Sequence, residues 1–124
     1  MNPGVRVAVV DDELPVRTAL GRLLRLAHYE VSLFASGEAF LESLEAQTPD
    51  CVILDINMPG MSGLDVQRRL RSVAIAIPAI CITSGEDVSL ARDALDVGAV
   101  DLLRKPFSNH DLLQALRTAL VRSD

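Results

Sequence analysis

Four largely apolar runs of this sequence each lead into residues suited to phosphoryl chemistry. They are Val7–Val10 before Asp11, Asp12 and Glu13; Cys51–Leu54 before Asp55; Ala79–Ile82 before Thr83 and Ser84; and Val100–Arg104 before Lys105 and Pro106. Such runs are typical of strands in a parallel α/β sheet, where binding sites form beyond the carboxyl ends of the strands. Three carboxylates, a hydroxyl and an ammonium would therefore share one crevice. The sequence predicts a magnesium-dependent acceptor of a phosphoryl group.

Each of these residue types has a role in such a site. Asp55 is the candidate nucleophile, because a carboxylate that attacks phosphorus forms an acyl phosphate. Asp11, Asp12 and Asp55 are candidate Mg²⁺ ligands, since Mg²⁺ prefers oxygen and its charge relieves repulsion among clustered carboxylates. Lys105 would balance the negative charge of the phosphoryl group, and Thr83 would donate a hydrogen bond to it.

Each assignment also has a structural alternative. Asp55 could cap the loop after its strand, and Asp11 or Asp12 could be the N-cap of the next helix or serve both purposes. Lys105 could be a solvated surface residue, and Thr83 a β-branched residue favoured in a strand. The combination of all five residues favours the site interpretation.

Strand and helix patterns alternate regularly along the chain. The predicted strands are Val5–Val10, Glu30–Phe34, Cys51–Leu54, Ala79–Ile82 and Val100–Arg104, and the predicted helices are Leu14–Ala27, Gly37 to about Ala46, Leu64–Ser72, Asp87–Val97, and Ser108 or Asn109 to about Val121. Five β–α units predict one α/β domain over residues 1–124, with a five-stranded parallel sheet and helices on both faces. Glu30–Phe34 is the most polar strand and is expected at an edge. The flavodoxin-like order 2-1-3-4-5 fits and places the switch point between the first and third strands.

The composition narrows the functional classes. The 124 residues are enough for one domain with a core, and the net charge of −5 argues against nonspecific nucleic-acid binding. We find no targeting segment and no apolar run of membrane-spanning length, so we expect a cytoplasmic protein without membrane contact. Cys51 and Cys81 fall in predicted core strands, which favours buried thiols in a reducing compartment.

Four motifs of the chain occur together in a known family. They are Val9-Val10-Asp11-Asp12-Glu13, Leu54-Asp55-Ile56-Asn57-Met58-Pro59-Gly60-Met61-Ser62-Gly63, Ile82-Thr83-Ser84, and Gly98-Ala99-Val100-Asp101 leading to Lys105-Pro106-Phe107. With these motifs in order and at the right spacing, the chain resembles the receiver domain of two-component response regulators. The loop after Asp55 and the Gly98–Asp101 run are similar to the FixJ/NarL-type subgroup.

The resemblance implies a mechanism and a set of partners. The phosphohistidine of a sensor histidine kinase would donate to Asp55, and the domain would catalyse only its own phosphorylation and dephosphorylation. Asp12, Asp55 and the backbone carbonyl of Asn57 would bind Mg²⁺ directly, and Asp11 through water. The Lys105-Pro106 bond would be cis, which would fix the direction of the lysine.

The resemblance also implies an output surface. The Asp87–Val97 helix, the Val100–Arg104 strand and the final helix would change their affinity for a partner, with homodimerisation as one form of this. Many members of the subgroup regulate transcription through a C-terminal helix-turn-helix domain, which these residues do not contain. The sequence leaves open whether the chain is part of a longer regulator.

One position departs from the family pattern. Most receivers have Tyr or Phe three residues before the conserved lysine, where this chain has Leu102. Together with Thr83 this residue would form the switch, and leucine offers less area and no hydroxyl. We expect phosphorylation of Asp55 to survive the replacement of the aromatic residue by Leu102. The conformational response that normally follows phosphorylation is the step that this replacement would affect. Asn57 and Gly85 flank the site, where they could tune the lifetime of the acyl phosphate.

Two other functional classes remain as alternatives. Leu102 motivates a phosphorylation-independent interaction scaffold, although such a scaffold has no need of the intact acceptor set. An aspartyl-phosphate hydrolase acting on small molecules would typically carry a second Asp two residues after the nucleophile, where this chain has Asn57.

Overall fold

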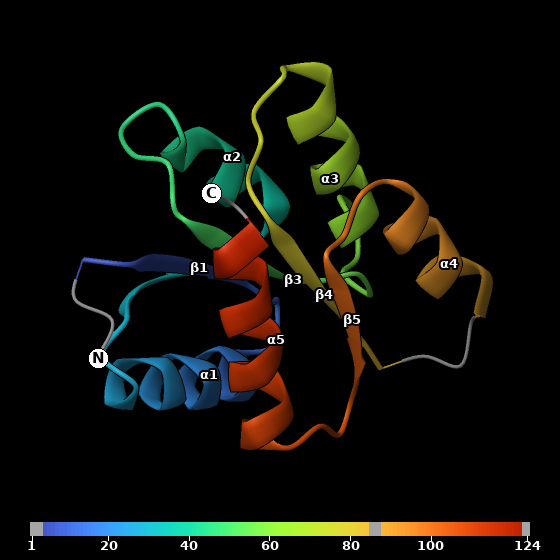
Figure 1. Cartoon of the computed structure of the whole chain (residues 1–124). Coiled ribbons are helices and arrows are strands. Elements are labelled where there is room, and N and C mark those ends of the chain that lie inside the picture. Colours follow the sequence, from blue (N-terminus) through green and yellow to red (C-terminus); the bar gives the residue numbers. More distant parts are fainter. Residues whose placement is uncertain (1–3, 85–87, 123–124) are drawn as a thin grey trace.

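The computed structural model describes residues 4–84 and 88–122, which form one parallel sheet covered by helices (Figure 1). The strands are β1 (Arg6–Val10), β2 (Glu30–Phe34), β3 (Cys51–Asp55), β4 (Ala79–Thr83) and β5 (Asp101–Arg104). The helices are α1 (Leu14–Leu26), α2 (Gly37–Ser43), α3 (Gly63–Ser72), α4 (Val88–Asp96) and α5 (Asn109–Arg122). The sheet has the order β2-β1-β3-β4-β5, so the predicted topology is confirmed. None of the helices described is long and apolar enough to cross a membrane.

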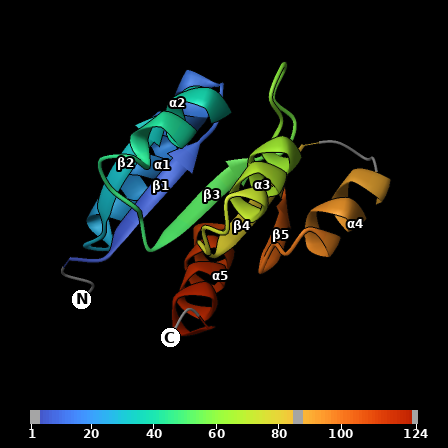
Figure 2. The ribbon, with the colours of Figure 1, turned by 90° about the horizontal axis from the view of Figure 1, so that it is seen from above.

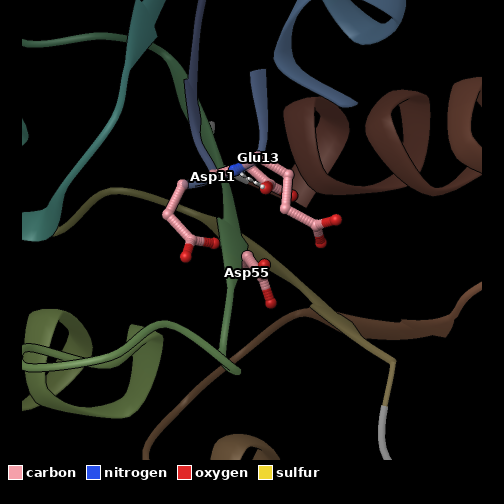
Figure 3. Close-up of side chains that lie close together, drawn as sticks. Asp11, Glu13 and Asp55 are labelled. Atoms are coloured by element: carbon pink, nitrogen blue, oxygen red, sulfur yellow. Dashed lines mark hydrogen bonds between the residues drawn. The ribbon is translucent and has the colours of Figure 1, made fainter. Parts of the chain in front are cut away.

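The burial of each strand follows its composition. Every residue of β3 and β4 is buried, as expected for central strands, whereas β2 exposes Glu30 and Ser32 and lies at an edge. Figure 2 shows the chain from above, with α2 near the β2 edge of the sheet and α4 near the β5 edge. The neighbouring strands β1 and β3 end at the same side of the sheet, and there Asp11 and Asp55 come together (Figure 3).

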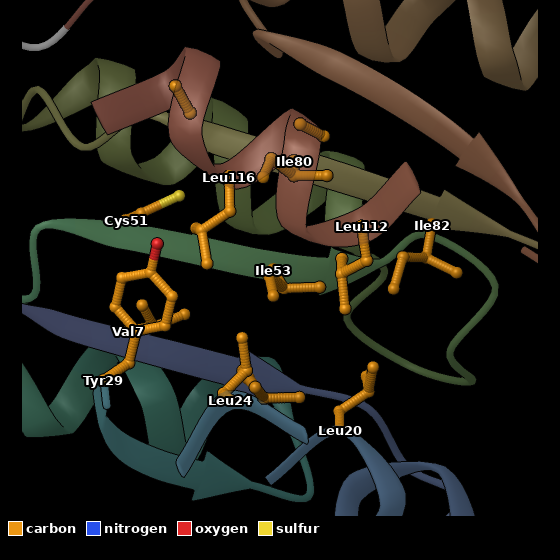
Figure 4. Packing of buried hydrophobic residues seen from close by; sticks show 13 residues of the cluster. Val7, Leu20, Leu24, Tyr29, Cys51, Ile53, Ile80, Ile82, Leu112 and Leu116 are labelled. Atoms are coloured by element: carbon orange, nitrogen blue, oxygen red, sulfur yellow. The ribbon is translucent and has the colours of Figure 1, made fainter. Parts of the chain in front are cut away.

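Alternating side chains of the strands build a separate core on each face of the sheet. On one face, α1 and α5 pack on the strands through four buried leucines, Leu20, Leu24, Leu112 and Leu116 (Figure 4). Burial of each such side chain contributes about 1.5–3 kcal/mol. On the other face, Phe40 of α2, Val66 of α3 and Ala94 of α4 cover the sheet. The two cores hold the strand ends in register and so fix the site above them.

Most element boundaries agree with the sequence prediction to within one or two residues. The predicted helix to Ala46 is too long, because the backbone N–H groups of Glu45 and Ala46 donate to carbonyls three residues earlier, and α2 ends at Ser43. Ser108 is the residue that caps α5, since its Oγ accepts from the N–H of Asp111 at 3.0 Å. Asp87 and Gly85, which the sequence assigned to a helix start and to the flank of the site, lie outside the described residues.

Candidate functional site

The predicted acceptor residues meet at the carboxyl edge of the sheet. Asp11 and Asp12 follow β1, Asp55 ends β3, Thr83 ends β4, and Lys105 follows β5. One oxygen from each of the carboxylates of Asp11, Asp12, Glu13 and Asp55 lies within 4.8 Å of the others. Figure 3 shows three of these side chains, from Asp11, Glu13 and Asp55, close together above the strand ends. The structure thus brings together the groups that the sequence placed at four separate strand ends.

Asp55 occupies the centre of the site. It is only 2% exposed, and its Oδ1 accepts from the N–H of Asn57 at 2.8 Å. Burial raises the pKa of the Asp55 carboxyl; the Asn57 N–H opposes the rise, and the neighbouring Asp11 carboxylate adds to it. A cation bound among these carboxylates would favour the ionised nucleophile.

Lys105 contacts three carboxylates. Its Nζ lies 3.3 Å from Asp11 Oδ2, 3.3 Å from Glu13 Oε1 and 3.6 Å from Asp55 Oδ2. Burial lowers the pKa of this ammonium, but Asp55 and Asp11 outweigh that effect and raise the pKa above its ordinary value. The lysine therefore stays charged and sits beside the oxygen atoms that would react. The Lys105-Pro106 peptide bond is cis, as predicted.

The start of α1 does not have Asp11 or Asp12 at its N-cap, the structural alternative considered for these two residues. Glu13 occupies the N-cap position, and its side chain makes no capping hydrogen bond. Asp11 Oδ1 instead accepts from the N–H of Glu13 at 2.9 Å, and Arg17 Nη1 donates to the backbone carbonyl of Asp11 at 2.8 Å. Neither Asp11 nor Asp12 is therefore the N-cap, and the Asp11 carboxylate accepts from the Glu13 N–H and from Lys105.

Asn57 connects the loop after β3 to the end of β4. Its side-chain Oδ1 accepts from Thr83 Oγ1 at 3.0 Å and from the N–H of Ser84 at 2.9 Å. Thr83 is only 3% exposed. The sequence singled out the backbone carbonyl of Asn57, and that role stays a prediction. It did not identify the side-chain contacts, which depend on how two loops meet.

A glycine allows the loop after Asp55 to pack closely. A Cβ at Gly63 would lie 2.8 Å from the backbone oxygen of Asp55 and 2.9 Å from Ile56 Cα. The first turn of α3 is further fixed by a capping box between Ser62 and Asp65. Gly63 thus lets the loop pack against Asp55 without taking part in the chemistry, and the sequence analysis placed it only in the loop after Asp55.

The donor set fits Mg²⁺. Asp11, Asp12 and Asp55 offer hard oxygen ligands within 4.8 Å of one another, and oxygen is the ligand type that Mg²⁺ prefers. Glu13 adds a fourth carboxylate that the sequence analysis did not assign to the site.

Leu102 lies on β5, three residues before Lys105, at the position where most receiver domains have Tyr or Phe. It is half-buried and packs in the core on the α4 side of the sheet, with Leu90, Ala94 and Ala99. The side chain thus occupies space under α4.

The comparisons with known proteins agree on one family. Residues 7–117 match the response regulator receiver domain. The response regulator protein TmoT of Ectopseudomonas mendocina is 44% identical over 114 residues, which cover 92% of this chain and 52% of TmoT. Nodulation protein W of Bradyrhizobium diazoefficiens is 40% identical over 116 residues, covering 94% of this chain and 51% of that protein. The chain spans about half the length of these curated relatives.

A solved structure agrees with this family assignment. The crystal structure of FixJ-N matches with a TM-score of 0.89 at 37% sequence identity, covering 94% of each chain. The predicted fold and the predicted family are therefore both confirmed. This chain belongs to the response regulator receiver domain family, and its fold is that of the receiver domains of two-component signalling.

Proposed function

We propose that this domain accepts a phosphoryl group on Asp55 from the phosphohistidine of a sensor histidine kinase. The observation that carries the proposal is the convergence of Asp11, Asp55, Thr83 and Lys105 at one edge of the sheet, within contact distances of one another or of shared neighbours. Membership of the receiver family supports the same chemistry. We place the protein in the cytoplasm, in keeping with its two free thiols.

The proposed reaction is a phosphoryl transfer. A bond forms between an Asp55 carboxylate oxygen and phosphorus while the bond between phosphorus and the donor histidine nitrogen breaks, and that nitrogen takes up a proton. Mg²⁺ held by Asp11, Asp12 and Asp55 would supply positive charge for the phosphoryl oxygens. Lys105 supplies a second positive charge at 3.6 Å from the carboxylate in the resting site. Hydrolysis of the acyl phosphate by water would reset the domain, so no separate substrate is turned over.

The proposed output begins at Thr83. Its hydroxyl would leave Asn57 and donate to a phosphoryl oxygen, which would shift the end of β4. Leu102 and Ala94 share the core beneath α4, so this shift would reach the surface formed by α4, β5 and α5. We propose that this surface binds a partner or a second copy of the domain, as part of a transcription regulator.

A second candidate is a scaffold that binds partners without phosphorylation. The observation that favours it is Leu102, which packs against the core that contains Ala94 of α4 and has no aromatic ring to rotate. A partner affinity that is the same with and without phosphate on Asp55 would support the scaffold.

The acceptor chemistry can be tested by the mass of the intact protein after incubation with acetyl phosphate. We expect one phosphoryl adduct that requires Mg²⁺ and is absent from the Asp55→Ala protein. Glu45→Gln, a change at an exposed position after α2, is the control and should retain the adduct. An adduct of equal rate in folded Asp55→Ala would contradict the proposal.

A further inference from the structure

Glu13 is a carboxylate of the site with no role among the acceptor residues assigned above. It stands at the N-cap of α1, a position where a side chain commonly accepts a hydrogen bond from the first turn, yet it makes no such bond. Its Oε1 lies 3.3 Å from Lys105 Nζ instead. The side chain therefore contacts a residue 92 positions away, whose Nζ also lies beside Asp11 and Asp55.

The backbone of Glu13 is fixed from two directions. Its N–H donates to Asp11 Oδ1 at 2.9 Å, and its carbonyl accepts from the N–H of Arg17 at 3.0 Å. Its side chain is 59% exposed, while the side chain of Lys105 is only 18% exposed. Glu13 thus approaches the lysine from the solvent side, where a phosphodonor would enter.

The other two carboxylates that contact Lys105, those of Asp11 and Asp55, are also predicted Mg²⁺ ligands. Asp11 and Asp55 are predicted to take part in Mg²⁺ binding, which would reduce their attraction for the ammonium. Glu13 belongs to the same carboxylate cluster but is outside the predicted ligand set, so we expect its contact with Lys105 to persist when the metal is bound. To reach an incoming phosphoryl group, Lys105 would then have to leave Glu13.

We infer that Glu13 is a positioning residue that holds Lys105 back from the incoming phosphoryl group and slows phosphorylation by small phosphodonors. This inference rests on the proposed function, because it concerns the rate of the same reaction. A phosphodonor would have to break the ion pair between Glu13 and Lys105 before the lysine could contact the phosphoryl group.

The test is the rate of adduct formation with acetyl phosphate and Mg²⁺ in the Glu13→Gln protein. An exposed ion pair is weak, so we expect the rate constant to rise by about two- to fivefold. Glu45→Gln carries the same change in net charge at a distant exposed position and should leave the rate unchanged. No increase in Glu13→Gln over wild type would overturn the inference.

Two further comparisons separate the contact with Lys105 from a general effect of charge. Phosphoramidate is a less negatively charged donor than acetyl phosphate. A restraint on Lys105 predicts a similar increase with both donors, whereas simple repulsion predicts a smaller increase with phosphoramidate. Combined with Lys105→Gln, the Glu13→Gln change should have no further effect. A clearly smaller gain with phosphoramidate than with acetyl phosphate, or a gain that survives in the Lys105→Gln background, would refute the role.

The wild-type reaction distinguishes this inference from the proposed function. A folded wild-type protein that forms no adduct with either donor contradicts the proposed function, and the inference with it. A wild-type adduct on Asp55 with an unchanged rate in Glu13→Gln overturns only the role of Glu13.

Discussion

The side-chain oxygen of Asn57 accepts a hydrogen bond from the Thr83 hydroxyl at 3.0 Å, which ties the loop after β3 to the end of β4. The same oxygen accepts from the N–H of Ser84 at 2.9 Å. The hydroxyl that a phosphoryl group would recruit is therefore already engaged. Modification of Asp55 would exchange one hydrogen bond of Thr83 for another.

Replacing Asn57 by Ala should make this exchange easier. Beryllium fluoride with Mg²⁺ mimics the phosphoryl group, and we expect it to bind Asn57→Ala roughly fivefold more tightly, because one neutral hydrogen bond contributes about 1 kcal/mol. Titration followed by amide NMR shifts measures the affinity. Asn109→Ala, at the exposed start of α5, should bind as wild type does. Unchanged or weaker binding by Asn57→Ala would show that the contact does not restrain Thr83.

The raised pKa of Asp55 predicts a pH-dependent stability. Burial is the main cause of the rise, and Asp11 adds to it. Between the unfolded and folded pKa values the folded state binds more protons, so this group makes stability fall as pH rises through that window. At about pH 7 in EDTA, Asp55→Asn should be more stable than wild type, and the difference should shrink toward about pH 4. Urea denaturation at the two pH values measures the free energy of unfolding of each protein. A wild type as stable as Asp55→Asn at neutral pH would contradict the expected cost of the buried Asp55 charge.

Mg²⁺ should stabilise the folded protein through the acidic cluster. At a concentration 100 times its Kd, a ligand that binds only the folded state adds about 2.7 kcal/mol to the free energy of unfolding. Asp12→Asn should lose most of this gain, because it removes one predicted ligand. Asp93→Asn, on the exposed side of α4, is the matched control and should keep the gain. Thermal unfolding in Mg²⁺ and in EDTA measures this stabilisation for each protein. An equal stabilisation of Asp12→Asn and wild type by Mg²⁺ would exclude Asp12 as a ligand.

Gly63→Ala should destabilise the protein and slow phosphorylation. The added Cβ would lie 2.8 Å from the Asp55 backbone oxygen, so the loop must shift, at a cost of about 1–3 kcal/mol. Gly60→Ala is the comparison: nothing lies within 4 Å of a Cβ there, but the φ of +74° carries a strain of about 1–2 kcal/mol. We expect Gly60→Ala to lose stability without the same loss of rate. Urea denaturation measures the stability of each variant, and the mass of the intact protein over time measures its rate of phosphorylation. Phosphorylation of Gly63→Ala at the wild-type rate would contradict the expected link between the packing of this loop and the reactivity of Asp55.

The sheet and the convergence of the site were predictable from the sequence because both depend on pattern. The apolar runs of β1, β3 and β4 require burial on two faces, and the polar residues of Glu30–Phe34 allow only an edge. Since parallel strands all end at one side of a sheet, the residues after each run had to meet.

The contacts of Glu13 and Asn57 were not predictable in this way. The Glu13 side chain meets Lys105 across 92 positions, and Asn57 meets Thr83 across 26. Both depend on side-chain direction and on how loops approach each other, which no periodicity encodes. The N-cap of α1 is Glu13, and not Asp11 or Asp12 as the structural alternative would have it; the Asp11 carboxylate contacts the Glu13 N–H and Lys105.

Whether Asp55 is the acceptor is tested most directly by chemical trapping. Borohydride reduces an aspartyl phosphate to homoserine, so protein treated with acetyl phosphate and Mg²⁺ can be reduced, digested and mapped by tandem mass spectrometry. We expect homoserine at position 55, dependent on Mg²⁺ and absent after EDTA. Homoserine at another carboxylate, or an unmodified Asp55 in folded protein, would contradict Asp55 as the acceptor.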